Sequence, residues 1–472
     1  MEHVSTFEVL PNEMILLVCQ YLCCAEILYS FFNLNSRLNS MLTNFCRYVN
    51  LKDVTYKQFD FVATQIVPQI GQSIRSFVFN GLWENILFKK QNSRFFHSKL
   101  SLMFPQLQTL SLINFIDRQL NLFLDKITDL SQLVKLDVRN LRNGHEEGSL
   151  EKILTANNNR LKFVLFDYDS INFILNETTN DEALSYSNIE ELAVNIKTHK
   201  TLAYLFTLVP DIRRLHVDFD QLSFDSKLTL ANVSSLIHLK DFQLRSINTY
   251  WSLDEIAHIL SKMPFLQRLA LDLCTEDVHF VDGQNFIRIL PSSIVEIHLF
   301  IIYYFFDSHI DVDTLLSTWS IHVQITCLLD EPNEYAIIHT IPCDLSVIFI
   351  PATIAKSMLT GSKYTRKQIV HLEITDFQEC ASIPIGVIAQ KFNHLRDLSL
   401  FLESPTVFVD SLILQVLSLW RDKNLRGFYI KGLLTDEISK NLRQWLIDHS
   451  HLRQEDSFIA EYDKNWTDIW LQ

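Results

Sequence analysis

Two acidic pairs are the first residues in this chain whose spacing could support chemistry. Asp167 with Asp169, and Asp218 with Asp220, have the form DxD, in which two carboxylates can share a metal ion. Each pair comes directly after a short apolar segment that recurs along the chain, so the recurring segment already accounts for its position. We therefore interpret both pairs as acidic strand ends and predict no metal site.

Other catalytic and nucleotide-binding patterns are incomplete. The 16 His residues include no HExxH, and the segment 360–363 (TGSK) lacks the first glycine of a phosphate-binding loop. The chain has no GxSxG, and its 8 Cys include no CxxC, so the cysteines indicate reduced thiols. We predict that the protein is not an enzyme and has no catalytic residues, metal or cofactor. An unrecognised enzyme is a weaker alternative, because no set of residues supports it.

Net charge and hydropathy narrow the classes of partner. The formal net charge of -14 predicts repulsion from a phosphate backbone, so we expect neither nucleic acid nor a membrane as partner. The apolar run from Ile297 to Phe306 is about half of a membrane span. Acids at Glu2 and Glu8, without a basic segment, do not resemble a secretion signal. We expect residence in the cytoplasm, the nucleus or both.

A six-residue template, apolar at positions 1, 4 and 6, organises the rest of the chain. Steps of 23 to 30 residues separate the clear neighbouring copies, and two weaker copies fall in the remaining gap. An irregular first copy, IRSFVF, begins at Ile74. The clear copies begin at Leu107, Leu133, Leu161, Ile189, Ile212, Leu239, Leu266, Ile294, Ile369, Leu395 and Leu425, and the weaker ones at Ile321 and Leu345.

This pattern predicts a short strand in each copy, with positions 4 and 6 buried and positions 3, 5 and 7 on the opposite face. Between strands, Leu253, Ile256 and Leu260 have helical spacing, and Ser252 is a suitable N-cap before Glu255. One strand and one helix cannot bury both apolar faces, so each unit must stack on its neighbours.

The periodicity resembles the leucine-rich-repeat family. That resemblance implies an α/β solenoid with parallel strands inside and helices outside, arranged here as one parallel stack. The family often has Asn or Cys at position 9, whereas here only Cys274 matches, so we expect irregular turns. The other residues at position 9 are Phe115, Leu141, Asp169, Lys197, Asp220 and Ile247.

The outward positions of successive copies would form one concave face that binds an unknown protein target. This face is polar with mixed charge, which favours a partner with matching charges. An equally simple interpretation is a solvated sheet face. The candidate partner-binding residues are Lys135, Asp137, Arg139, Arg214, His216, Asp218, Asp241, Arg245, Arg268 and Asp272. Phe300, Phe401 and Tyr429 occupy similar positions in later copies, and His216, His298 and His371 are interpreted as members of the polar face.

The N-terminal segment has no repeat and predicts three short helices. Pro11 suits a first helical position, and the residues after it line one face at helical spacing: Ile15, Val18, Cys19 and Leu22. A second helix would place Ile27, Phe31 and Leu34 inward, and a third Leu38, Met41, Leu42 and Phe45. So small a core is marginal alone and needs a neighbour to complete it.

These helices resemble the F-box family. The opening 10–15 (LPNEMI), the turn Tyr21 and Leu22, the segment 25–28 (AEIL) and the closing segment 35–38 (NSRL) carry the resemblance, although Leu38 stands where the family commonly has Trp. The resemblance implies docking to a Skp-type adaptor and the cullin ligase core. The adaptor-binding residues would be Leu10, Pro11, Ile15, Val18 and Leu22.

Together, these patterns predict a substrate-recognition adaptor for protein ubiquitination. The predicted divisions are a helical module at 5–50, a linker helix and irregular first repeat at 51–106, repeats at 107–450 and a C-terminal cap at 451–472. The alternative is a ligase-independent interaction scaffold, in which the N-terminal helices only cover the end of the repeats.

Overall fold

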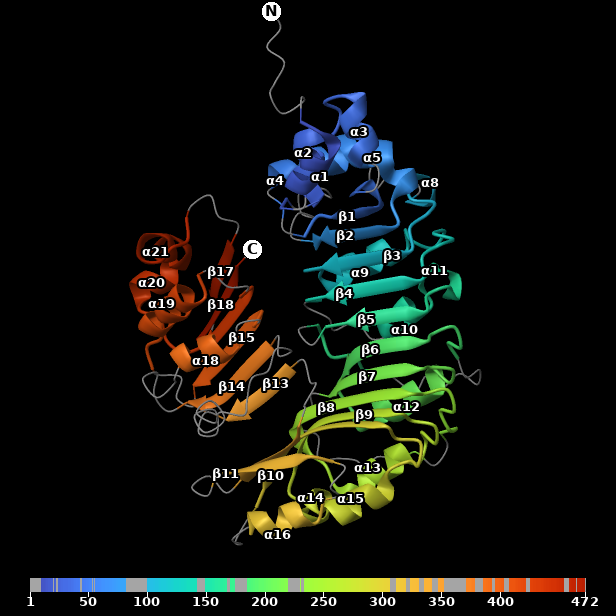
Figure 1. Cartoon of the computed structure of the whole chain (residues 1–472), viewed down its shortest axis with the longest axis vertical. Helices are drawn as coiled ribbons and strands as arrows, with labels where there is room; N and C mark the ends of the chain where they lie inside the picture. Colours follow the sequence, from blue (N-terminus) through green and yellow to red (C-terminus); the bar gives the residue numbers. More distant parts are fainter. Residues whose placement is uncertain are drawn as a thin grey trace, which may run out of the picture. The chain divides into compact units, whose positions relative to one another are not determined.

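Eighteen strands and a series of short helices make up the part of the chain that the computed structural model describes (Figure 1). The structure describes residues 10–471 except 20, 23, 43–44, 53, 55, 82–99, 142–148, 168–169, 175–184, 220–229, 231–232, 306–310, 320–322, 331–334, 342–346, 352–370, 378–384, 393–394, 403–406, 422–424, 454–457 and 464.

The strands are β1 (Tyr48–Asn50), β2 (Ser76–Asn80), β3 (Thr109–Ile113), β4 (Lys135–Arg139), β5 (Phe163–Phe166), β6 (Glu191–Ile196), β7 (Arg214–Phe219), β8 (Asp241–Tyr250), β9 (Arg268–Thr275), β10 (Glu296–Tyr304), β11 (Ile325–Asp330), β12 (Tyr335–Thr340), β13 (Val347–Pro351), β14 (His371–Phe377), β15 (Asp397–Leu402), β16 (Gly427–Lys431), β17 (Phe458–Asp463) and β18 (Trp466–Leu471).

The helices are α1 (Asn12–Cys19), α2 (Cys24–Phe31), α3 (Ser36–Leu42), η1 (Phe45–Arg47), α4 (Tyr56–Phe61), η2 (Val62–Ile66), α5 (Val67–Ile70), η3 (Gly71–Ser73), α8 (Leu100–Met103), α9 (Asp117–Leu124), α10 (Ser149–Leu154), α11 (Ala156–Asn159), α12 (His199–Leu208), α13 (Leu253–Leu260), α14 (Val278–Val281), α15 (Gly283–Ile289), α16 (Val312–Ser317), α18 (Ile385–Lys391), α19 (Asp410–Leu419), α20 (Asp436–Lys440) and α21 (Leu442–His449).

The fold is α/β, and its larger sheet is mostly parallel. This sheet has 12 strands in the order β1-β2-β3-β4-β5-β6-β7-β8-β9-β10-β12-β11, and a second sheet has 6 strands in the order β13-β14-β15-β16-β18-β17. The chain divides into two compact units, residues 1–243 with 261–266, and residues 244–260 with 267–472.

The repeated template coincides with the strands. Each of the eight copies from Leu107 to Ile294 carries a strand that begins at template position 3. The pairing aligns these positions directly, as in Thr109 opposite Lys135 and Glu191 opposite Arg214. Positions 4 and 6 are buried in the first seven of these copies, so their apolar side chains form the core on one side of the sheet. Figure 1 shows α9, α10 and α12 behind the strands in this view.

The predicted helix start at Ser252 is confirmed. The Ser252 hydroxyl accepts a hydrogen bond from the Glu255 N–H at 3.3 Å, and the Ser252 N–H donates to the Glu255 carboxylate at 2.9 Å. This reciprocal pair satisfies two backbone donors at the start of α13. Leu253, Ile256 and Leu260 are then buried on its inner face.

The structure differs from the expected single parallel stack. β12 pairs antiparallel with both β10 and β11, and the chain then begins a second sheet at β13. β11 and β12 are separated by four residues, 331–334, whereas a parallel crossover needs a dozen or more. The copy at Ile321 therefore cannot form a parallel unit with β12. The sequence interpretation had placed no strand at β12.

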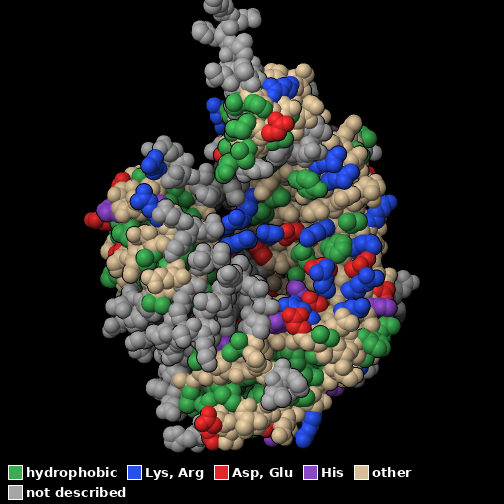
Figure 2. Space-filling model, in the orientation of Figure 1, with side chains coloured by type: hydrophobic (Ala, Val, Ile, Leu, Met, Phe, Trp, Pro, Cys, Tyr) green, Lys and Arg blue, Asp and Glu red, His purple; other side chains and the backbone are tan. Residues whose placement is uncertain are grey.

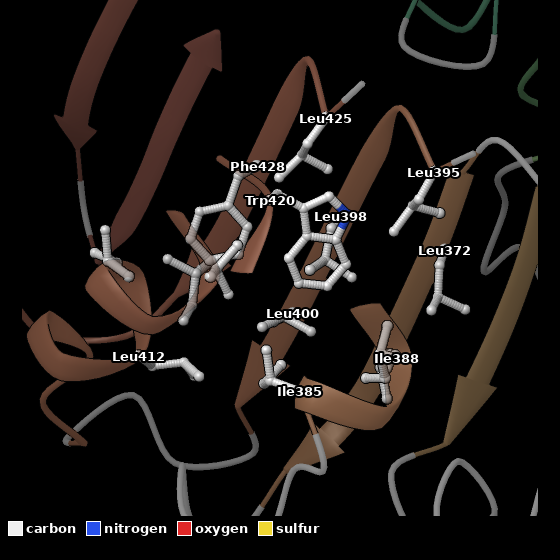
Figure 3. Close-up of a cluster of buried hydrophobic side chains, with 14 of the residues drawn as sticks. Leu372, Ile385, Ile388, Leu395, Leu398, Leu400, Leu412, Trp420, Leu425 and Phe428 are labelled. Carbon is white, nitrogen blue, oxygen red and sulfur yellow. The ribbon is translucent and has the colours of Figure 1, made fainter. Parts of the chain in front are cut away.

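The second sheet has its own core, shown in Figure 3. Leu372, Leu398 and Leu400 project from β14 and β15 toward Ile388 on α18 and Leu412 on α19, and all five are buried. At the C-terminal end of the described residues, β18 pairs antiparallel with β16, and β17 pairs antiparallel with β18.

Candidate functional site

Helices α1, α2 and α3 surround a small apolar core. Leu10, Leu22, Phe31 and Met41 pack around it from partly buried positions. The core's fully buried members are Ile15, Cys19, Ile27, Leu38 and Leu42. Leu38 lies inside this core with an exposed fraction of 2%, so it supports the packing of the three helices. Leu34, which was expected to point inward, is 57% exposed, and the side chain of Phe45 lies outside the described residues.

A row of exposed apolar side chains runs along α1. Met14 is 47%, Leu17 46% and Val18 37% exposed, and their spacing at i, i+3 and i+4 places them on one side of the helix, while Tyr21, 84% exposed, follows in the turn after the helix. We name these four residues the α1 apolar face. Hydrophobic side chains gather over this region in Figure 2. Contiguous exposed apolar groups of this kind mark interaction sites in soluble proteins.

The five residues predicted to contact an adaptor separate into three groups by exposure. Pro11 and Val18 are exposed, whereas Leu10 and Leu22 are partly buried against the core. Ile15 is 1% exposed, so it can meet a partner only if the helices move apart.

The sequence interpretation missed Met14, Leu17 and Tyr21 as surface residues. The signal was present, because positions 14–19 are apolar without interruption. A helix that is apolar on every side cannot bury all of it in a core this small, so one side must be exposed or covered by a partner.

The three helices are held to one another and to the following elements. The Arg37 guanidinium donates to Asn12 Oδ1 at 2.8 Å and to the Leu10 carbonyl at 2.5 Å, which ties α3 to the start of α1. The rings of Tyr29 on α2 and Phe61 on α4 meet edge to face at 5.1 Å. Neighbouring elements therefore complete the marginal core, and α1 keeps its apolar face outward.

The second candidate is the polar face of the larger sheet, first within residues 1–243. The Arg214 guanidinium lies 2.6 Å from the Glu191 carboxylate on the adjacent strand, and His216 Nε2 lies 3.8 Å from Asp241. Lys135 and Asp218 are half-buried on the same face. Figure 2 shows Lys and Arg interspersed with Asp and Glu over this sheet. Opposite charges on adjacent strands stabilise the sheet, so these groups already satisfy one another in part.

Asp137 and Arg139 form a tighter cluster on β4. Asp137 is only 7% exposed, and its carboxylate lies 2.7 Å from the Arg139 guanidinium and accepts a bond from the Ser111 hydroxyl at 3.4 Å. The hydrogen bond to Asp137 raises the pKa of Arg139. Arg139 is therefore the exposed member of this pair and the one that a partner could reach.

Within residues 244–260 and 267–472, the same face is more enclosed than expected. Arg245 and Asp272 form an ion pair at 3.9 Å with exposed fractions of 8% and 1%. Arg268 pairs with Glu296 at 3.3 Å and stays partly exposed. Only Arg268 of these three predicted residues is available to a macromolecule without rearrangement.

Two expectations for β10 are wrong. Phe300, predicted as an outward aromatic anchor, is fully buried, and His298, predicted on a displayed face, is 3% exposed with its Nε2 2.7 Å from Glu296. The cause is an apolar cluster that includes Ala270, Phe300 and Ile337 and covers this side of β9, β10 and β12. Phe401 instead packs edge to face on Trp466, and Tyr429 on Trp470, while the side chain of His371 lies outside the described residues.

Three asparagines at the ends of β2, β3 and β4 form a row of side-chain hydrogen bonds that was not predicted from the sequence, and we call this row the asparagine ladder. Asn114 Nδ2 donates to Asn80 Oδ1 at 3.1 Å, and Asn140 Nδ2 donates to Asn114 Oδ1 at 2.5 Å. Asn114 and Asn140 follow their strands at template position 8, one place before the position at which the leucine-rich-repeat family often has Asn or Cys. The ladder fixes the turns of neighbouring units to one another.

The described cysteines and acidic residues give little support to a nucleophilic or metal-binding role. Burial raises the pKa of the Cys46 and Cys327 thiols to about 11, so both stay protonated at neutral pH and are poor nucleophiles. Asp169 and Asp220, the second members of the acidic pairs, lie outside the described residues. No group of three His, Cys, Asp or Glu in the described part of the chain could hold a metal ion.

Comparisons with known proteins assign no function to these surfaces. Across the residues that the structure places, we find no helix long and apolar enough to cross a membrane. No protein-family model matches the chain, and no curated protein matches its sequence.

Proposed function

We propose that this chain is a substrate-recognition adaptor of a cullin-type (SCF) ubiquitin ligase. In this proposal, residues 5–50 are an F-box-like module that docks to a Skp-type adaptor. Residues 107–450 are a leucine-rich-repeat solenoid that selects the protein to be ubiquitinated, 51–106 link the two, and 451–472 cap the last repeat.

The observation that carries the proposal is the α1 apolar face within a segment that resembles the F-box. Its four side chains are between 37% and 84% exposed, although the helix has a core side of its own. A helix with apolar residues on its outer side is suited to docking against a partner's apolar groove. The in-register pairing of the template from β2 to β7 supports the solenoid part of the proposal.

The polar face of the larger sheet within residues 1–243 is the proposed target surface. Lys135, Arg139 and Arg214 keep exposed or partly exposed cationic side chains, while the acidic neighbours Asp137 and Glu191 are more enclosed. The face therefore offers mainly cations to a partner. Charges at such a surface influence the association rate and the choice of partner more than the affinity.

The second candidate is the ligase-independent scaffold. The packing of α2 on α4 favours it, because the helices then act as an end cover for the sheet. An end cover explains the buried side of the module but gives no reason for the α1 apolar face.

Co-purification with a Skp-type adaptor separates the two candidates. We expect the intact chain to retain both the adaptor and cullin, and Leu17→Asp to lose them, because the charge would lie in the apolar contact. The matched control is Leu102→Asp, since Leu102 is a 73% exposed leucine on α8, outside the module. Failure of the intact chain to retain the adaptor would exclude the ligase role and leave the scaffold.

A further inference from the structure

A groove runs across the larger sheet along the N-terminal ends of β5, β6 and β7. It has a volume of about 670 Å³ and belongs entirely to the unit formed by residues 1–243 and 261–266. All of its described lining residues are of polar or charged types except Val134, and their aliphatic carbons contribute part of the surface. Besides Val134, the lining residues are Ser131, Asn159, Arg160, Lys162, Ser187, Asn188, Glu190, Asp211, Arg213 and His238.

The repeat places three charged side chains in a row along this groove. Lys162, Glu190 and Arg213 all occupy template position 2 in consecutive copies, so the in-register pairing of their strands brings them side by side. The Glu190 carboxylate lies 2.7 Å from Lys162 Nζ and 3.6 Å from Arg213 Nη1. One carboxylate therefore lies beside two cations, so the row of three side chains carries a net positive charge.

An unusual turn adds a third cation. Asn157, Asn158 and Asn159 all have positive φ, between 56° and 57°, which non-glycine residues adopt rarely and at a cost. The turn is held by Asn157 Nδ2, which donates to the carbonyls of Leu130 and Leu133 at 2.8 and 2.9 Å.

This fixed turn ends at Arg160 on the rim of the groove. The Arg160 side chain is exposed and forms no ion pair with any residue that the structure describes. Asparagine adopts this conformation more readily than other residues with a side chain, and the two hydrogen bonds of Asn157 hold the turn in place. The turn therefore fixes the backbone at Arg160, a cation whose charge is available to a ligand.

The groove is therefore locally cationic in a chain whose net charge is -14. Arg160, Lys162 and Arg213 outnumber Glu190 and Asp211, and His238 Nε2 lies 3.7 Å from Asp211. The hydroxyl and amide groups of the lining can bond to a peptide backbone. The two carboxylates would repel a continuous phosphate chain, whereas a peptide can place its N–H groups against them and its carboxylates against the cations.

We propose that this groove binds an acidic peptide segment of a partner protein. Carboxylates of the segment pair with Arg160, Lys162 and Arg213, and its backbone bonds to the neutral polar lining. The inference does not depend on adaptor docking, because the groove and the α1 apolar face are formed by different residues, and either can fail without the other.

The test is fluorescence anisotropy with the full chain and a short labelled peptide of alternating Glu and Gly. We expect saturable binding that weakens as salt is added, because exposed ion pairs are screened. The double variant Arg160→Glu/Arg213→Glu should weaken binding by at least ~tenfold, and Arg160→Gln, the milder change, by ~threefold. The control is Arg288→Glu, which makes at an exposed arginine on α15 the same substitution as each of the two changes in the double variant and should stay within about twofold.

Three results would overturn the proposal: no binding by the intact chain, equal loss in the double variant and the Arg288→Glu control, or equal binding of a Lys and Gly peptide. A single-stranded RNA that binds the groove as tightly as the acidic peptide would reassign it to nucleic acid. Circular dichroism of each variant checks that the fold is kept, and the single change Arg160→Gln keeps the test valid if the double variant does not fold.

Discussion

Asp167 shows how a single carboxylate at a strand end can couple the fold to pH. Its carboxylate accepts hydrogen bonds from the Ser170 hydroxyl at 2.6 Å and from the Asn140 N–H at 2.8 Å. Burial nevertheless raises the pKa of Asp167, and these two hydrogen bonds and the nearby Arg139 only partly oppose it. The folded chain therefore holds the Asp167 proton more tightly than the unfolded chain does.

We predict that Asp167→Asn becomes progressively more favourable, relative to the parent, as the pH rises above the ordinary aspartate pKa of about 4 and through the raised pKa of the folded chain. The stability contributed by a carboxyl with a raised pKa is complete below its unfolded pKa and is lost as the pH rises through its folded pKa. The variant has no proton to lose, so it escapes this loss. Urea unfolding at several pH values measures the difference.

The exposed change Asp129→Asn is the control, since it removes the same charge from a surface site. A difference between Asp167→Asn and the parent that does not change with pH, after the control is subtracted, would contradict the assigned cause.

At the same scale, the sequence could predict which template positions are buried but not how far the polar ones are enclosed. Leu136 and Val138 are buried at positions 4 and 6 as the alternation requires. Asp137 lies between them and was expected on the open face, yet Ser111 and Arg139 enclose it. Alternation specifies the face of a strand, whereas exposure depends on neighbouring side chains that a single strand does not reveal.

Among the elements, the asparagine ladder joins the ends of three successive strands. Asn114 is its middle member, since it donates to Asn80 and accepts from Asn140, and its φ of 58° places it in the left-handed region. Asparagine tolerates that conformation better than other residues with a side chain, so one residue type serves both the turn and the ladder.

We predict that Asn114→Ala lowers the free energy of unfolding by about 2–3 kcal/mol, from two lost side-chain hydrogen bonds and a strained backbone. Asn114→Gly loses the same bonds without the strain and should be about 1 kcal/mol less destabilised. Thermal or urea unfolding of the two variants gives both values. Equal stability of the Ala and Gly variants would show that the left-handed backbone carries no cost.

The periodicity of the sequence does not predict the antiparallel strand β12. The copies predicted the strands from β2 to β10 and again from β13 to β16, each of which begins at template position 3, because these units have the length of a parallel crossover. β12 follows β11 too closely for that crossover, so it pairs antiparallel, and a search for a fixed period could not find it. The α1 apolar face was missed for a different reason: the sequence shows an apolar helix but not which of its sides the small core uses.

At the scale of the whole molecule, two separate surfaces have different proposed binding partners. The α1 apolar face would hold an adaptor, and the groove at Arg160 would hold an acidic segment. The larger sheet pairs successive repeats in register, so the repeat brings together the charged residues that line the groove. The two compact units and two sheets replace the single stack that periodicity predicted.

Adaptor docking is the central claim, and calorimetric titration of a purified Skp-type adaptor into the purified full chain tests it most directly. We predict one-site binding with a negative heat-capacity change, because apolar surface is buried. Val18→Asp should weaken this binding by at least ~tenfold, since a charge would be desolvated in the contact, while Val278→Asp, at a 58% exposed valine on α14, should leave it unchanged. The absence of binding by the intact chain, or equal affinity of Val18→Asp and the intact chain, would contradict the account.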